Sequence, residues 1–208
     1  METDLKDKLL AHGYCVLTFD SVADFGKACS CLGDVYHETE IRFQPEKSDF
    51  AFGTRSVPFH TDNPSVPWVA WFCQKQDAFF GETFLLDVRQ VLSFMTMDDQ
   101  RLLTTLSAKL PNRDAFYPLL QIQSKPHVSY MPHIWLDAEA TGAASRALKQ
   151  FHEIVLHLRA EKLYAVVRLE ERQALFIDNQ LMLHARDALS PQSDRFLMRA
   201  YIRKKSAD

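Results

Sequence analysis

The sequence lacks the features that mark fibrous, secreted and membrane-spanning chains. Glycine is scarce, with 6 in 208 residues, which excludes collagen-like and glycine-rich repeats. The 4 cysteines include no CxxC pair, so we expect free, partly buried thiols in a reducing compartment rather than disulfides or a zinc knuckle. No apolar run approaches the length of a membrane span, and the opening METDLKDKLLAHG contains no apolar signal core. These absences predict a cytoplasmic protein without a membrane partner.

A strong charge of either sign is also missing. The formal net charge is −3, both signs are spread along the chain, and the first basic cluster is the short tail IRKKSAD. This distribution argues against a nucleic-acid partner. Apolar material, in contrast, is plentiful, with 47% hydrophobic residues and 15 phenylalanines. That amount builds a substantial core, and we expect residues 1–208 to form a single domain.

Local patterns predict helices and short strands in no regular alternation. Helical spacing with capping residues covers residues 3–13, 21–33, 88–106 and 137–163. Runs rich in β-formers cover residues 14–19, 34–43 and 69–87, and further strands joined by turns cover 164–203. Without the repeating strand–helix–strand order of a parallel sheet, the pattern favours a mainly antiparallel sandwich or barrel with helices packed outside.

The stretch VPFHTDNPSVPW, residues 57–68, places an imidazole and a carboxylate two positions apart. Side chains at i and i+2 of a strand share one face, so His60 and Asp62 at a strand end can hold one metal ion together. The alternative is a surface histidine followed by an Asp/Asn-Pro turn.

A second histidine suits the same site. His184 follows a strand-like run and a predicted Asp178–Asn179 turn in LFIDNQLMLHARDAL. Two histidines and one carboxylate leave coordination positions open for a co-substrate and O₂, as in non-haem Fe(II) oxygenases. Taken alone, His184 also fits a structural histidine whose ring nitrogens are hydrogen-bonded in the core or at the surface.

Two arginines lie four positions apart in the apolar segment SDRFLMRAYI. In a strand, Arg195, Leu197 and Arg199 share one face. Guanidinium groups on such a face need anions nearby if they are buried, and their planar fork suits carboxylates. A solvated face on an edge strand is the alternative.

Taken together, HTDNP, FFGETFLLD, LFIDNQLMLHAR and DRFLMRAYI, in this order, resemble the taurine dioxygenase/clavaminate synthase-like superfamily of Fe(II)/2-oxoglutarate-dependent oxygenases. The resemblance covers residues 57–88 and 165–203, and the arginines follow His184 at 11 and 15 positions. The implied fold is a double-stranded β-helix, or jelly roll, with flanking helices. The implied cofactor is Fe(II), with 2-oxoglutarate and O₂ as co-substrates.

The resemblance also implies a role for each matching residue. His60, Asp62 and His184 would be the catalytic metal ligands. Thr83 and Arg195 would bind 2-oxoglutarate, and Arg199 would bind an anionic group of the substrate. The implied reaction is hydroxylation of an unactivated C–H bond in a small molecule, an amino acid or related metabolite, with release of succinate and CO₂. Desaturation or cyclisation would use the same ligands, whereas the retained Asp62 argues against halogenation.

Substrate recognition in this superfamily depends on a lid and on inserted loops. We expect the lid within residues 107–134, which hold no long periodic segment. Arg55 and Ser56, just before the HTD strand, and Tyr130 are further candidates for substrate contact. The aromatic and basic residues of the expected lid face a substrate or pack the lid down: Arg113, Phe116, Tyr117, Lys125, His127 and Tyr130. His133 is expected to be structural, because its six-residue spacing from His127 suits no shared metal.

Two other functions use the same residues differently. One is a hydrolase that binds zinc at His60, Asp62 and His184. The other is a jelly-roll metal-binding protein that has no 2-oxoglutarate. The pair Arg195 and Arg199, arranged as a clamp for an oxoacid, counts against the first. The intact set of ligands counts against the second.

Overall fold

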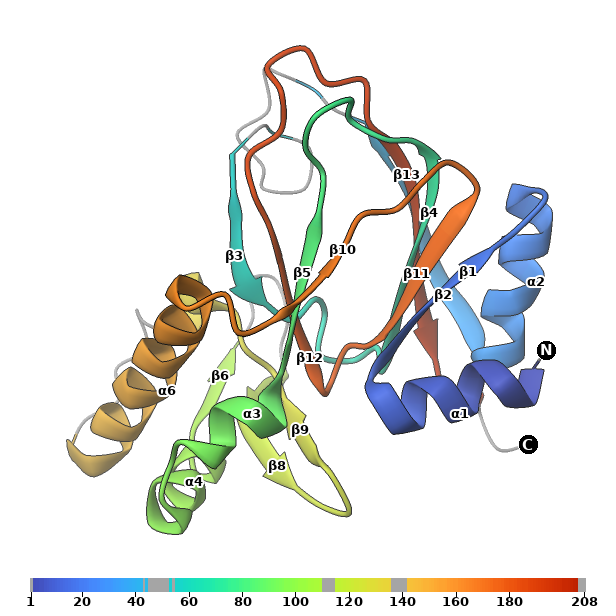
Figure 1. The fold of residues 1–208 in the computed structure, drawn as a ribbon. Helices are drawn as coiled ribbons and strands as arrows, with labels where there is room; N and C mark the ends of the chain where they lie inside the picture. Colours follow the sequence, from blue (N-terminus) through green and yellow to red (C-terminus); the bar gives the residue numbers. More distant parts are fainter. Residues whose placement is uncertain are drawn as a thin grey trace.

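The structure of the protein, a computed structural model, describes residues 2–42, 44, 53, 55–109, 115–135 and 142–205 (Figure 1). Its helices are α1 (Glu2–His12), α2 (Val22–Leu32), α3 (Val88–Ser93), α4 (Met97–Thr104), α5 (Pro132–Trp135) and α6 (Gly142–Ala160). The first strands are β1 (Tyr14–Thr18), β2 (Asp34–Arg42), β3 (Val57–His60), β4 (Trp68–Lys75), β5 (Thr83–Asp87), β6 (Ser107–Lys109) and β7 (Phe116–Pro118). The remaining strands are β8 (Leu120–Ile122), β9 (Pro126–Val128), β10 (Ala165–Val167), β11 (Gln173–Asp178), β12 (Met182–Arg186) and β13 (Phe196–Arg203). No helix in these ranges is long and apolar enough to cross a membrane.

Two antiparallel sheets form the body of the molecule. The larger has the order β1-β11-β4-β13-β2 and the smaller has the order β10-β5-β12-β3. Every pair of neighbouring strands in both sheets is antiparallel. Successive strands alternate between the two sheets over much of the chain, as in a jelly roll. The mainly antiparallel fold expected from the sequence is confirmed.

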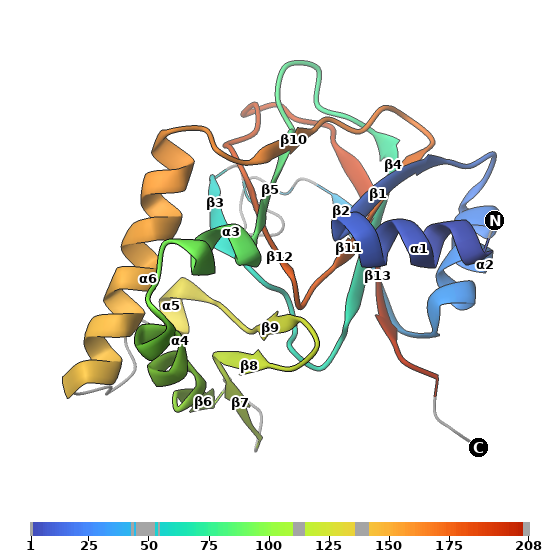
Figure 2. The same ribbon diagram turned by 60° about the horizontal axis from the view of Figure 1, so that its bottom comes forward.

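The larger sheet is covered on both faces, and β11 explains how. Leu175 and Ile177 belong to the core between the sheets, whereas Ala174 and Phe176 pack in a second core beneath α1 and α2. A strand buried on both sides needs a continuous apolar run, which the segment ALFI provides. Figures 1 and 2 show α1 and α2 on this outer face, and α6 on the far side of the smaller sheet.

Helix boundaries follow from capping residues. Ser21 accepts a hydrogen bond from Asp24 N at 3.2 Å and starts α2 as expected. The helix predicted over residues 88–106 is divided, because Thr96 accepts from Asp99 N at 3.1 Å and caps a new helix, α4. The helix predicted over residues 137–163 is observed as α6, and residues 137–141 lie outside the described ranges.

The segment expected to form a lid folds into two short hairpins and α5. The hairpins are β6–β7 and β8–β9, visible below the sheets in Figure 2. Side chains from this segment are buried in the main core, among them Leu119, Leu120 and Val128. Arg113 lies outside the described residues. The described part of the segment is therefore anchored to the body, and a lid function for it stays a prediction.

Candidate metal centre

The two histidines of the candidate site lie opposite each other on neighbouring strands of the smaller sheet. His60 is the last residue of β3, and His184 of β12 is its partner in the strand register. Their ring centroids are 4.2 Å apart. Asp62 lies two residues beyond the end of β3, in a bend rather than in the strand itself. Strand pairing thus joins two motifs that are distant in the sequence.

The three side chains direct their polar atoms toward one point. Asp62 Oδ1 lies 3.7 Å from His60 Nε2, and Asp62 Oδ2 lies 3.9 Å from His184 Nε2. All three ligand atoms lie within 4.8 Å of one another. These distances are too long for hydrogen bonds and fit donors that face a common ion.

The orientation of His60 is set from behind. Its Nδ1 lies 2.9 Å from the carbonyl oxygen of Pro58. A carbonyl oxygen only accepts, so Nδ1 carries the hydrogen and Nε2 presents a lone pair. A metal-binding histidine is held in this way, with its second nitrogen donating to a backbone carbonyl.

The buried groups of the site have the charges that a divalent cation needs. Burial alone would raise the pKa of Asp62, but His60, His184 and Arg199 hold it well below its usual range. Burial, with the neighbouring His60, lowers the pKa of His184 to about 3. The site therefore offers an anionic, partly buried Asp62 and a neutral, buried His184 at neutral pH. Asp62 Oδ2 is buried and has no hydrogen-bond partner among the described residues, so a bound metal ion would satisfy it.

Asn179 fixes the bend that carries Asp62. Its Oδ1 accepts from Asp62 N at 2.9 Å, while its Nδ2 donates to the carbonyls of Asn63 at 3.2 Å and Val66 at 2.9 Å. The residue is almost completely buried. The turn predicted at Asp178–Asn179 therefore holds the first metal motif in place as well as leading to the second.

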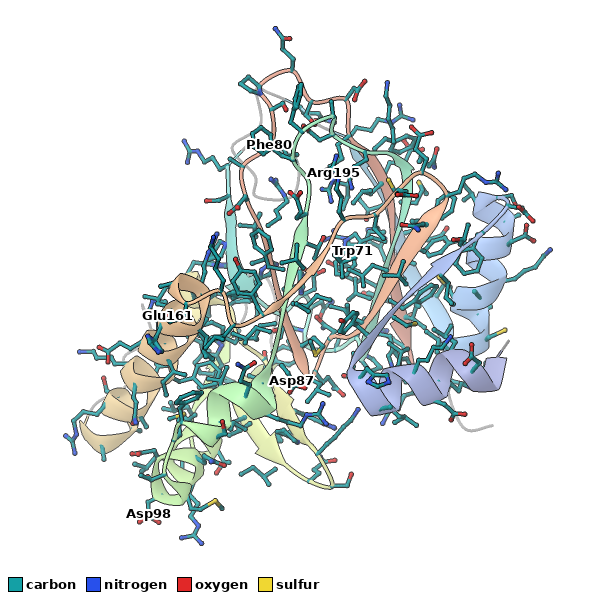
Figure 3. The ribbon with its side chains drawn as sticks, in the orientation of Figure 1. Trp71, Phe80, Asp87, Asp98, Glu161 and Arg195 are labelled. Carbon is teal, nitrogen blue, oxygen red and sulfur yellow. The ribbon has the colours of Figure 1, made fainter. Side chains whose placement is uncertain are left out.

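A cavity of about 420 Å³ opens beside the three ligands. Thr83, Arg195 and Arg199 line it, as the resemblance implies. Leu197 lines it too and shares the face predicted for the two arginines, although β13 itself begins one residue after Arg195. Trp71 from β4 lines the same cavity, and its ring centroid is 5.0 Å from that of His184. Figure 3 shows Trp71 and Arg195 in the interior between the two sheets. The cavity thus joins the candidate metal ligands to two guanidinium groups.

Three of the residues expected to contact substrate lie elsewhere. Arg55 and Ser56 are exposed and are not among the residues that line the cavity. Tyr130 is completely buried, its ring packs against Phe151 with centroids 5.1 Å apart, and its hydroxyl bonds to His152 Nδ1. The expected contact of Tyr130 with substrate is therefore wrong, because the ring belongs to the core under α6.

Tyr130 supports the site through its backbone instead. Thr61 N donates to the Tyr130 carbonyl at 2.7 Å, and Tyr130 N donates to Thr61 Oγ1 at 2.9 Å. Thr61 lies between His60 and Asp62, so this pair of bonds holds the HTD segment against the chain that precedes α5.

The structure adds lining residues that the sequence reasoning passed over. Arg186 and His133 both line the cavity, although His133 was expected to be only structural. Arg186 lies two positions after His184 on β12, so strand alternation already placed the two on one face. No comparable signal existed for His133, since α5 and its position become known only from the fold.

The end of the cavity away from His60 is strongly cationic. Arg195 is buried, and burial together with the nearby Arg186 lowers its pKa to about 10, so it stays charged at neutral pH. Arg186 is also buried and donates to the carbonyl of Gly53 at 2.7 Å. Two buried guanidinium groups and the Thr83 hydroxyl form a site suited to a carboxylate.

A buried carboxylate joins the two loops behind this cationic end. Asp77, which is 1% exposed, accepts hydrogen bonds from the backbone of Phe79 at 3.0 Å and Phe80 at 2.9 Å. It also accepts from Ser190 N at 3.1 Å and Ser190 Oγ at 2.8 Å. Burial alone would raise the pKa of Asp77, but the bonds from Ser193, Phe79, Phe80 and Ser190 hold it well below its usual range.

We expect Asp77→Asn to lower the free energy of unfolding at pH 7 by about 2 kcal/mol, because an amide nitrogen would face buried donors. The unfolded pKa is about 4, so the depressed folded pKa makes the carboxylate stabilising above pH 4 and this contribution is lost as the pH falls. Urea unfolding at pH 7 and pH 3.5 measures both effects, and the difference between wild type and variant should shrink at the lower pH. Asp194→Asn is the control, since that exposed residue forms a surface ion pair with Lys75 and its replacement should change stability by less than about 0.5 kcal/mol. An equal loss of stability at both pH values would contradict the assignment.

Comparisons with known proteins agree with this geometry. Among solved structures, asparagine oxygenase (AsnO) has a TM-score of 0.80 and 18% identity, covering 98% of this chain and 78% of that one. The non-heme iron oxygenase OrfP, solved with Fe and alpha-ketoglutaric acid, has a TM-score of 0.76 and 17% identity over 97% of this chain and 79% of that one. PvcB from Pseudomonas aeruginosa has a TM-score of 0.70 and 18% identity over 97% of this chain and 80% of that one. These similarities show a shared jelly-roll fold.

No curated protein matches the sequence. The family model described as taurine catabolism dioxygenase TauD, TfdA family matches residues 3–201, nearly the whole chain. The match includes both histidine motifs, Arg195 and Arg199. The chain therefore belongs to the TauD, TfdA family of dioxygenases.

Proposed function

We propose that this protein is an Fe(II)- and 2-oxoglutarate-dependent dioxygenase that hydroxylates an unactivated C–H bond of a small molecule. The observation that carries the proposal is the single cavity that joins His60, Asp62 and His184 to the buried Arg195. Two imidazoles and one carboxylate suit Fe(II) and leave positions open for other ligands. Among the similar structures, asparagine oxygenase is described in complex with Fe(II), and OrfP with Fe and alpha-ketoglutaric acid.

Each residue that lines the cavity would have a role set by its position. His60, Asp62 and His184 would hold Fe(II), which together with 2-oxoglutarate and O₂ supplies the oxidising chemistry and releases succinate and CO₂. Arg195 and the Thr83 hydroxyl would bind the distal carboxylate of 2-oxoglutarate through charge-assisted hydrogen bonds. The apolar surfaces of Trp71 and the neighbouring Leu197 would keep water from the reacting atoms.

Arg199 would bind an anionic group of the substrate close to the metal ligands. Its Nη1 lies 3.5 Å from Asp62 Oδ2, and its guanidinium lies 4.5 Å from the centre of the Tyr201 ring. A substrate carboxylate held there would bring the adjacent carbon atoms near the metal ligands. We therefore propose an amino acid or a related carboxylate as substrate. Asparagine oxygenase and OrfP have been crystallised with a hydroxylated asparagine and a hydroxylated arginine, respectively.

The test begins with the protein purified without oxygen. Addition of Fe(II) and then 2-oxoglutarate should produce the weak charge-transfer band of a chelated Fe(II) complex in the visible spectrum. Air-saturated buffer and a panel of amino acids and other small carboxylates should then give succinate and a product heavier by one oxygen atom. A folded, iron-loaded protein that neither develops the band nor releases succinate would exclude the proposal and favour a zinc hydrolase or a binding protein.

A further inference from the structure

Arg195 is held from behind by two neutral oxygen acceptors on the segment between β4 and β5. Arg195 Nε donates to Gln76 Oε1 at 3.0 Å, and Arg195 Nη2 lies 3.5 Å from the carbonyl oxygen of Gly81. An arginine offers five N–H donors in a rigid fork. These two contacts use Nε and Nη2, which lie on one edge of the planar guanidinium group. Gln76 and Gly81 therefore set the direction of its remaining N–H groups.

Gln76 is itself fixed at both ends of its amide. Its Nε2 donates to the carbonyl oxygen of Leu169 at 2.9 Å, and its Oε1 also accepts from Asp77 N at 3.0 Å. The Leu169 carbonyl can only accept and the Asp77 N–H can only donate, so the amide has one orientation, with the oxygen toward Arg195. The same Asp77 ties this segment to the loop before β13.

Gly81 leaves the space that this contact needs. Its φ is +102°, and a Cβ atom at this position would lie 2.2 Å from Gln76 Oε1 and 3.3 Å from Arg195 Nε. A side chain at residue 81 would therefore displace the amide that touches Arg195. Gln76, Gly81 and Arg195 are packed as one unit at the cationic end of the cavity.

The chemistry of the acceptor matters as much as its position. A carboxylate behind Arg195 would neutralise the guanidinium and compete with an anionic ligand, whereas an amide and a carbonyl orient it and leave its charge available. We propose that Gln76 is a positioning residue that aims Arg195 and thereby sets the affinity of the protein for 2-oxoglutarate. This inference rests on the proposed role of Arg195 in binding that co-substrate.

The test compares Gln76→Met, Gln76→Glu and the control Gln100→Met. Gln100 is also a partly buried glutamine whose Nε2 donates to backbone carbonyls, of Leu92 at 2.9 Å and Met95 at 3.3 Å. These bonds join α4 to the end of α3 and involve neither Arg195 nor Gly81, whereas Gln76 accepts directly from Arg195. The affinity for 2-oxoglutarate is measured on the Fe(II)-loaded protein without oxygen, by titration of the charge-transfer band. The affinity for Co(II) alone is measured by calorimetry, and KM and kcat are measured from succinate release.

Gln76→Met should weaken 2-oxoglutarate binding by about 10-fold or more, the effect of losing one hydrogen bond to a charged group. Gln76→Glu, which keeps an acceptor but adds a negative charge, should weaken it at least as much. In both variants the KM for 2-oxoglutarate should rise while kcat at saturation and the Co(II) affinity change by less than about 2-fold. Gln100→Met should leave all of these values unchanged.

If Gln76 only supported the fold, its replacement would change the Co(II) affinity or kcat and not specifically the binding of 2-oxoglutarate. If the Gln76 variants weaken Co(II) and 2-oxoglutarate binding in parallel, or lower kcat without raising KM, the positioning role is excluded. It is also excluded if Gln76→Met binds 2-oxoglutarate as the wild type does while Arg195→Met does not, a result that leaves the proposed function intact. If Arg195→Met itself retains wild-type affinity for 2-oxoglutarate, the proposed role of Arg195 fails and the inference fails with it.

Discussion

Asp62→Ala should abolish tight Fe(II) binding and, with it, succinate production. Replacing a residue that only supports a metal ligand costs 10–100-fold in affinity, so we expect removal of the only carboxylate in this ligand set to cost more than about 100-fold. Asp62 Oδ2 is buried without a hydrogen-bond partner among the described residues, and its removal therefore breaks no hydrogen bond of that atom. The measurement is calorimetric titration with Co(II) and with Fe(II) under nitrogen, followed by succinate release in air.

Asp77→Asn is the matched control for this change. It also replaces a carboxylate withdrawn from solvent, but Asp77 does not line the cavity that holds the ligands. The control variant should be less stable yet bind Co(II) with wild-type affinity. If Asp62→Ala binds metal as tightly as the wild type does, the ion is held by other residues and the assignment of this site is wrong.

Arg195→Met should have the second largest effect, a loss of roughly 100-fold in 2-oxoglutarate affinity. The variant removes a buried charge and the planar fork that suits a carboxylate, and each charge-assisted hydrogen bond contributes about 1.5–3 kcal/mol. Arg195→Lys keeps the charge but not the planar fork. We expect its affinity for 2-oxoglutarate to lie between those of Arg195→Met and the wild type. Titration of the charge-transfer band without oxygen gives these affinities directly.

Arg203→Met serves as the control on β13, the strand that directly follows Arg195. Arg203 is the last residue of β13, but its guanidinium stacks over the ring of Tyr36 at 3.4 Å and does not line the cavity. Its replacement should leave 2-oxoglutarate binding unchanged. Co(II) binding should be unchanged in all three variants, so a parallel loss of metal affinity in Arg195→Met would point to a misfolded site instead of a lost co-substrate contact.

The parts of the site that follow strand alternation were predictable from the sequence. His184 and Arg186 on β12, and Arg195 and Arg199 near or on β13, share faces because alternate residues of a strand do so. The antiparallel class of the fold followed from short strands without a regular alternation with helices. Arg186 was missed only because the rule was not applied beyond His184.

The remaining features depend on contacts between distant segments. Nothing local distinguishes Tyr130, which packs in the core, from an aromatic residue that faces a substrate. The hydrogen bonds of Asn179 to the HTD bend and of Gln76 to Arg195 join turns and loops that meet only in the folded protein. The division of residues 88–106 into two helices shows the reverse case, since the Thr96 cap was visible in the sequence and outweighed the helical spacing.

The pairing of β3 with β12 has a consequence for how the protein reaches its native state. Asp62 and the side chain that fixes it, Asn179, are separated by 117 residues, so the ligand set exists only after most of the chain has been synthesised and both sheets have closed. Contacts of such long range form late and slowly, because closing the intervening loop costs conformational entropy before the contacts contribute any stabilisation. During refolding, metal binding would therefore appear only when the two sheets finally assemble. An ion bound to His60, Asp62 and His184 would stabilise the assembled sheets and so oppose their separation.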